Sequence, residues 1–238
     1  MRFFIFKKMN KSIKVIAFDA DDTLWVNETY FREAEHQFAK LFTAFETANK
    51  IEQELFKTEI RNLSLYGYGV KGFMLSMVEC ALEVSNNNLN PTLLNDVLNI
   101  GKEMLEKPIK LLDGVEEVLK ALQGRYKLIV ATKGDLLDQE RKLAKSGLLK
   151  YFHHIEVMSE KKEADYKKLV AHLDINTSEL LMIGNSLKSD VLPLINIGAS
   201  AIHVPFHTTW AHEEVSEADQ KNVDYLTINN LKELVSIL

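Results

Sequence analysis

The stretch FDADDTL, residues 18–24, places three carboxylates within four residues, directly after an apolar run. The three are Asp19, Asp21 and Asp22. Neighbouring carboxylates repel one another unless they share a proton or surround a cation. This stretch therefore predicts a site at the end of a buried strand where the repulsion is offset by one of these two means.

Polar residues of three further segments follow later apolar runs: Thr132, Lys133 and Gly134; Lys161 and Lys162; and GNSLKSD, residues 184–190. Ligands of open α/β sheets bind at the carboxyl ends of the strands, so we expect these groups to gather with the carboxylates at one sheet edge. Magnesium binds through a few carboxylate or amide oxygens together with substrate phosphate. Hydroxyl, ammonium and carboxylate groups at one edge therefore predict a magnesium and phosphate site.

The elements that position these groups are indicated by five short aliphatic runs. Such runs are typical of strands buried on both faces of a parallel sheet, and they cover residues 14–18, 127–131, 154–158, 180–183 and 200–204. Helical patterns alternate with the runs beyond residue 110. The alternation predicts an α/β fold with a doubly wound, mainly parallel, Rossmann-like sheet.

Residues 26–107 have a different character, with helical periodicity and no convincing strand pattern. Four apolar stripes predict four helices, with Asn27 as the N-cap of the first and Pro91 near the start of the fourth. We therefore predict a Rossmann-like core of residues 1–25 and 108–238, interrupted by a helical cap of residues 26–107.

Composition excludes several classes of protein. The 238 residues are 46% hydrophobic with a formal net charge of −5, and no long basic run prepares a surface for nucleic acid or anionic lipid. Cys80 is the single cysteine, so no internal disulfide is expected. The start MRFFIFKKMN is too short for a signal peptide, and no apolar run reaches the roughly 18 residues of a membrane span. We expect a cytoplasmic protein that starts at Met1 or Met9. The sequence carries no signal for an oligomeric state.

Four motifs occur in order along the chain: Asp19-x-Asp21-x-Thr23, Thr132, Lys161 in SEKKEADY, and Gly184-Asn185-Ser186 with Asp190. Together they resemble the motifs of the haloacid dehalogenase-like (HAD) hydrolase superfamily. The helical insert resembles the cap of its C1-capped, phosphatase-type members. The resemblance covers essentially the whole chain.

The resemblance implies a role for each motif. Asp19 would attack phosphorus and form an aspartyl-phosphate. Asp21 would protonate the leaving oxygen and then deprotonate the attacking water, while its main-chain carbonyl binds Mg²⁺. Thr132 would bind a phosphoryl oxygen, and Lys161 would offset negative charge on the nucleophile and the phosphate.

Asn185 departs from the family pattern, which usually has aspartate there. Its amide supplies a hard oxygen without charge, so we expect Mg²⁺ to bind Asp19, Asp21 and Asn185. The ion should bind more weakly than it would with aspartate at position 185. Asp190 would complete the site, either as a ligand, through a coordinated water, or by holding Lys161.

Some of these residues also have simpler interpretations. Asp22 is expected to cap the turn after the first strand. Lys133 either points to solvent or binds substrate together with Gly134. Of the two adjacent lysines, Lys161 is expected in the site and Lys162 at the surface.

The predicted function is a Mg²⁺-dependent phosphatase acting on a small phosphorylated metabolite. Asp21 argues against a haloacid dehalogenase proper, because such enzymes resemble this chain in fold but lack an acidic residue there and need no metal. A phosphomutase of the β-phosphoglucomutase type would use the same nucleophile and stays open. So does a non-catalytic binding protein that lost efficient metal binding through Asn185.

Overall fold

The computed structural model describes residues 12–216, 219 and 223–238. The stretch MRFFIFKKMN, with its two alternative start residues, lies outside the described residues. The chain divides into two compact units. The described residues of the ranges 12–26, 109–133 and 140–238 form one, here called the sheet unit, and residues 27–108 and 134–139 form the other, here called the helical unit.

The sheet unit contains a six-stranded parallel sheet in the order β3-β2-β1-β4-β5-β6. Its strands are β1 (Val15–Phe18), β2 (Lys127–Lys133), β3 (Ile155–Met158), β4 (Leu180–Gly184), β5 (Ser200–His203) and β6 (Leu226–Thr227). The predicted fold class is confirmed, and the first five strands match the five aliphatic runs. The sixth strand was missed because two residues carry no periodic pattern.

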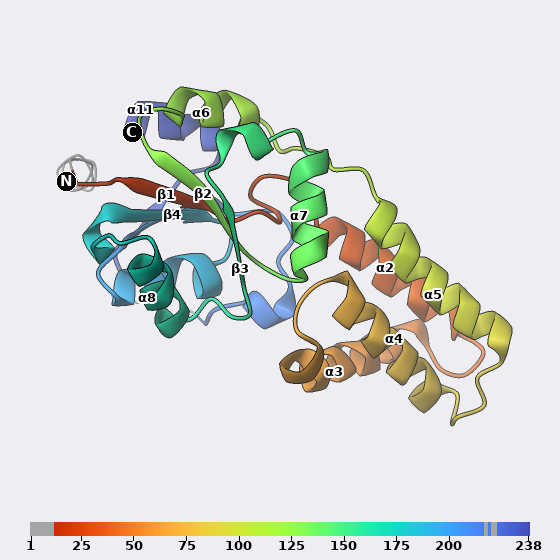
Figure 1. Cartoon of the computed structure of the whole chain (residues 1–238). Helices are drawn as coiled ribbons and strands as arrows, with labels where there is room; N and C mark the ends of the chain where they lie inside the picture. The colour runs from red at the N-terminus through yellow and green to blue at the C-terminus, as the bar shows by residue number, and fades with distance from the viewer. Residues whose placement is uncertain (1–11, 217–218, 220–222) are drawn as a thin grey trace. The chain divides into compact units, whose positions relative to one another are not determined.

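Both faces of this sheet are buried, as the aliphatic runs predict. Val15 and Ala17 of β1 pack in one apolar core with residues of α8 and α9, whereas Ile16 and Phe18 pack in a second core with α6 and α11. Figure 1 shows α6 and α11 on one side of the sheet and α8 on the other. The bounds of these helices are α6 (Val115–Leu122), α8 (Glu163–His172), α9 (Leu192–Asn196) and α11 (Leu234–Ile237).

The helical unit confirms the four predicted helices, which are α2 (Glu28–Leu41), α3 (Ala48–Tyr66), α4 (Val70–Val84) and α5 (Pro91–Glu106). Pro91 occupies the first turn of α5, where the Asn90 side chain accepts a hydrogen bond from the backbone N of Leu93 at 2.9 Å. The unit has an apolar core of its own, and Cys80 is buried in it.

The remaining elements are short, apart from α7 (Leu136–Lys145), whose residues belong to both units. Four 3₁₀ turns are η1 (Leu149–Tyr151), η2 (Thr177–Glu179), η4 (Ala211–Glu213) and η5 (Leu231–Glu233), and η3 (Leu187–Val191) is a π-turn. Among the described residues, no helix combines the length and the apolar character that crossing a membrane requires.

Candidate active site

Asp19 lies directly after β1, at the carboxyl edge of the sheet. Its backbone N donates a hydrogen bond to the carbonyl of Ile183 in β4 at 2.9 Å, which extends the ladder by one residue and fixes the side chain over the edge. The carboxylate is buried. Its Oδ1 accepts a hydrogen bond from Lys161 Nζ at 2.5 Å, and its Oδ2 accepts one from Thr23 Oγ1 at 3.3 Å.

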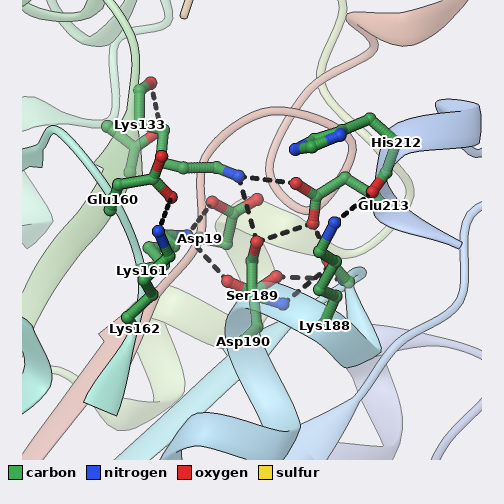
Figure 2. A network of polar contacts seen from close by, with 12 residues as sticks. Asp19, Lys133, Glu160, Lys161, Lys162, Lys188, Ser189, Asp190, His212 and Glu213 are labelled. Atoms are coloured by element: carbon green, nitrogen blue, oxygen red, sulfur yellow. Dashed lines mark hydrogen bonds and ion pairs between the residues drawn. The ribbon is translucent and has the colours of Figure 1, made fainter. Parts of the chain in front are cut away.

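Lys161 joins two carboxylates in this buried cluster. Its Nζ also lies 2.7 Å from Oδ1 of Asp190, and Figure 2 shows the ammonium between the two acids. The Lys161 side chain is 1% exposed, whereas that of Lys162 is 73% exposed. The structure therefore brings Lys161 into the site and leaves Lys162 at the surface.

The electrostatics of the cluster follow from burial and from this pairing. Burial raises the pKa of Asp19 to about 7, against the opposing effect of Lys161. Burial would lower the pKa of Lys161, but the carboxylates of Asp19 and Asp190 outweigh it and raise that pKa. Lys161 therefore stays a cation at neutral pH. It lies beside the Asp19 carboxyl group, whose pKa is set by the opposing effects of burial and of this ammonium.

Asp190 is held against the sheet by the loop after β4. Its Oδ2 accepts a hydrogen bond from the backbone N of Ser186 at 3.0 Å. A Cβ added at Gly184 would lie 2.3 Å from the Asp190 carboxylate, so only glycine permits this close approach. The π-turn η3 is fixed further by Tyr166, whose hydroxyl donates to the Ser189 carbonyl at 2.9 Å.

Thr23 brings together the two oxygens predicted to bind a cation. Its hydroxyl lies 3.3 Å from Oδ2 of Asp19 and 3.3 Å from Oδ1 of Asn185. Carboxylate and amide oxygens are hard ligands of the kind Mg²⁺ prefers, so the donor set fits the predicted metal. Within residues 12–216, 219 and 223–238, no group of three or more histidine, cysteine, aspartate or glutamate side chains has metal-binding geometry.

The Asp21 side chain contacts a tryptophan and a lysine. Its Oδ1 accepts hydrogen bonds from Trp25 Nε1 at 2.7 Å and Lys142 Nζ at 2.8 Å. Lys142 was missed by the sequence analysis, because it occupies an ordinary polar position of α7. Asp22 has a positive φ of 62°, and its backbone N donates to the Trp25 carbonyl at 2.7 Å, which suits the predicted turn.

The end of β2 and the residue that follows it belong to different units. Thr132 is buried at the carboxyl end of the strand, where its hydroxyl donates to the Lys133 carbonyl at 3.2 Å. Lys133 belongs to the sheet unit and turns its ammonium toward Glu213 and Ser189 (Figure 2). Gly134 belongs to the helical unit, so its part in the site stays a prediction.

Glu213 is a second residue that sequence reasoning missed. It lies in η4, and it accepts hydrogen bonds from Lys133 Nζ at 2.6 Å, Ser186 Oγ at 2.5 Å and Ser189 Oγ at 2.6 Å. It is the last residue of the stretch HVPFHTTWAHE, residues 203–213, in which three histidines and a tryptophan are more conspicuous than the carboxylate. The Glu213 carboxylate contacts the loop after β4, and so does His203, whose Nε2 lies 3.0 Å from the carbonyl oxygen of Asn185.

Comparison with known proteins supports the same family as the motifs do. The family described as haloacid dehalogenase-like hydrolase matches residues 13–198. Pyrimidine 5'-nucleotidase YjjG of Escherichia coli (strain K12) is 24% identical over 234 residues, which cover 94% of this chain and 96% of that protein.

Solved structures share the fold. A haloacid dehalogenase-like family hydrolase from Xanthomonas campestris is 33% identical, with a TM-score of 0.84 over 94% of this chain and 90% of that one. The 2-haloacid dehalogenase from Pseudomonas syringae pv. Tomato DC3000 is 17% identical, with a TM-score of 0.63 over 94% and 97%, and shows the fold alone. The chain is a member of the haloacid dehalogenase-like hydrolase family.

Proposed function

We propose that this chain is a Mg²⁺-dependent phosphatase that releases inorganic phosphate from a small phosphorylated metabolite. The observation that carries the proposal is the buried Asp19 carboxylate at the sheet edge, 2.5 Å from Lys161 and linked through Thr23 to Asn185. A nucleophile needs a cationic neighbour to approach an anionic phosphate, and Lys161 supplies one.

The proposed reaction has two steps. An oxygen of Asp19 attacks phosphorus, the bond to the leaving oxygen breaks, and Asp21 gives that oxygen a proton. Asp21 then takes a proton from a water molecule, which attacks the aspartyl-phosphate, releases inorganic phosphate and restores Asp19. Lys161 and Thr132 hold the phosphoryl oxygens while charge builds on them.

Asp19, the main-chain carbonyl of Asp21 and Asn185 would hold Mg²⁺. When bound, the ion would neutralise charge on the Asp19 carboxylate and on a phosphoryl oxygen. Asp190 acts in this scheme by orienting Lys161, because its two oxygens already accept hydrogen bonds from Lys161 and Ser186.

Nucleoside 5'-monophosphates are the first substrates to test, since YjjG is named as a pyrimidine 5'-nucleotidase and matches nearly the whole chain. Asp21 favours a phosphatase over a dehalogenase, because leaving-group protonation needs an acidic residue at that position.

The test is phosphate release from p-nitrophenyl phosphate, nucleotides, sugar phosphates and phosphorylated acids, with Mg²⁺ and with EDTA. We expect release with Mg²⁺ only. Asp19→Asn should lower the rate by a factor of about 10³ or more, because the covalent nucleophile is lost, while circular dichroism stays unchanged. Near-normal turnover in folded Asp19→Asn would rule out the covalent mechanism, and a product isomer without free phosphate would indicate a mutase.

A further inference from the structure

Lys133 and Glu213 form an ion pair beside the candidate active site, and the proposed phosphoryl transfer uses neither charge. Lys133 Nζ lies 2.6 Å from Oε1 of Glu213, and the two side chains are 14% and 13% exposed. Lys133 Nζ also donates to Ser189 Oγ at 3.0 Å, next in sequence to Asp190. The pair is therefore attached to the same loop that holds Lys161 in place (Figure 2).

The carboxylate of Glu213 is held on both sides. Its Oε1 faces Lys133, and its Oε2 accepts from the hydroxyls of Ser186 and Ser189. Burial would raise the pKa of Glu213, but Lys133 and the two hydroxyls lower it to about 2. The group is therefore a carboxylate at neutral pH, and Lys133 always has an anion beside it.

The backbone around Glu213 is fixed as well. Lys188, in the π-turn η3, donates from Nζ to the carbonyl of His212 at 2.5 Å. Two contacts on adjacent residues thus join η4 to η3, so the carboxylate does not depend on a loose loop for its position.

A neutralised ammonium at a phosphate site has a consequence for substrate choice. A lone ammonium there would attract a second anionic group on the substrate, such as a carboxylate on the leaving group. With a carboxylate 2.6 Å from the ammonium, attraction and repulsion act over similar distances and largely cancel. An uncharged alcohol, which needs no cation, loses nothing by this arrangement.

We propose that Glu213 determines specificity by neutralising Lys133, so that the site selects phosphate esters with an uncharged leaving group and discriminates against phosphorylated acids. The inference rests on the proposed phosphatase function. It names the chemical class of the substrate and a residue that the catalytic motifs do not include.

The test uses two competitors of p-nitrophenyl phosphate hydrolysis, glycerol 3-phosphate and 3-phosphoglycerate. They share a carbon skeleton and differ in a hydroxymethyl group against a carboxylate. Glycerol 3-phosphate should inhibit the unaltered protein more strongly. Glu213→Gln preserves the shape of the side chain and removes its charge, so it should lower the inhibition constant of 3-phosphoglycerate about tenfold and change that of glycerol 3-phosphate less than about twofold.

Two variants control for general effects of charge. Glu214→Gln makes the same change at the next residue, which is exposed, and should leave both inhibition constants unchanged. The double variant Lys133→Met with Glu213→Gln should lose the gain for 3-phosphoglycerate, because Glu213 acts through Lys133. Should Glu213→Gln fail to fold, Lys133→Met alone gives the reverse test, with weaker inhibition by 3-phosphoglycerate.

The outcomes separate this inference from the proposed function. Absence of p-nitrophenyl phosphate hydrolysis by the unaltered protein with Mg²⁺ would overturn the phosphatase and this inference together. If the unaltered protein does hydrolyse p-nitrophenyl phosphate, three results would overturn the role of Glu213 alone. The ratio of the two inhibition constants could be unchanged in Glu213→Gln, the tighter inhibition by 3-phosphoglycerate could persist in the double variant, or neither competitor could inhibit.

Discussion

Each of the two units contains a cluster of buried or half-buried charged side chains, and the clusters differ in how their charges are paired. In the sheet unit, Lys161 lies between Asp19 and Asp190, and each carboxylate has donors on both oxygens. In the helical unit, Arg32 pairs with Glu28 at 3.1 Å and Glu35 at 2.9 Å.

Glu59 belongs to the second cluster but has no such partner. Its Oε1 is buried without a hydrogen-bond partner among the described residues. Burial, together with the nearby Glu35 and Glu28, raises the pKa of Glu59 to about 9. Burial raises the pKa of an acid in both clusters, but to about 7 at Asp19, where Lys161 opposes the rise, and to about 9 at Glu59, where one oxygen has no donor. Only the first cluster is equipped for chemistry on an anion.

The largest effect should come from removing the shared cation of the first cluster. Lys161→Met leaves Asp19 and Asp190 facing each other without a counter-charge, and we expect a loss of about 3–5 kcal/mol of unfolding free energy along with phosphate release. Urea denaturation measures the first and an activity assay the second. Lys162→Met, at the exposed neighbour, should change stability by less than about 0.5 kcal/mol. Equal effects of the two variants would remove the distinction between them.

In the second cluster, removing a charge should raise the free energy of unfolding. Because Glu59 has a pKa of about 9 in the folded protein and an ordinary one when unfolded, folding takes up a proton between these values, so its contribution to stability falls as pH rises through this window. Glu59→Gln never ionises, and it should stabilise the protein by about 1–3 kcal/mol at neutral pH.

Urea denaturation at about pH 5 and about pH 8 checks this, with the gain expected to be larger at the higher pH. Glu54→Gln, on the exposed side of the same helix, is the matched control. A loss of stability in Glu59→Gln at both pH values would mean that Glu59 is charged and paired.

A smaller effect is expected from adding a carboxylate to the first cluster. Asn185→Asp restores the residue more usual in the family and should bind Mg²⁺ about tenfold more tightly, since ligand charge raises cation affinity. Without Mg²⁺ the added charge should lower the melting temperature, and with Mg²⁺ it should raise it. Asn88→Asp, in an exposed loop of the helical unit, controls for charge alone. Insensitivity of both melting curves to Mg²⁺ would contradict the proposed ligand set.

The sequence predicted much of the fold because its signals are local. Five buried strands and four amphipathic helices each repeat a pattern within a few residues of chain, as in Val15–Phe18 and Glu28–Leu41. The motif residues Asp19, Lys161 and Asp190 could be grouped because parallel strands end at one edge.

The missed residues depend on distant contacts. Lys142 meets Asp21 across 121 positions of sequence, and Glu213 meets Lys133 across 80. Both occupy ordinary polar positions, where a charged residue predicts only exposure to solvent. Glu59 illustrates the converse, since nothing in its own helix indicates that one oxygen is buried without a donor.

The missing side chain at Gly184 has a consequence for anyone who redesigns this site. Because the Asp190 carboxylate fills the space that any Cβ would need, even alanine there would displace the acid and, with it, the ammonium that faces the nucleophile. Gly184 thus constrains the reactive centre because it has no Cβ in the space that the Asp190 carboxylate occupies. Mutagenesis libraries aimed at new substrates should leave that position fixed and vary the surrounding loops instead.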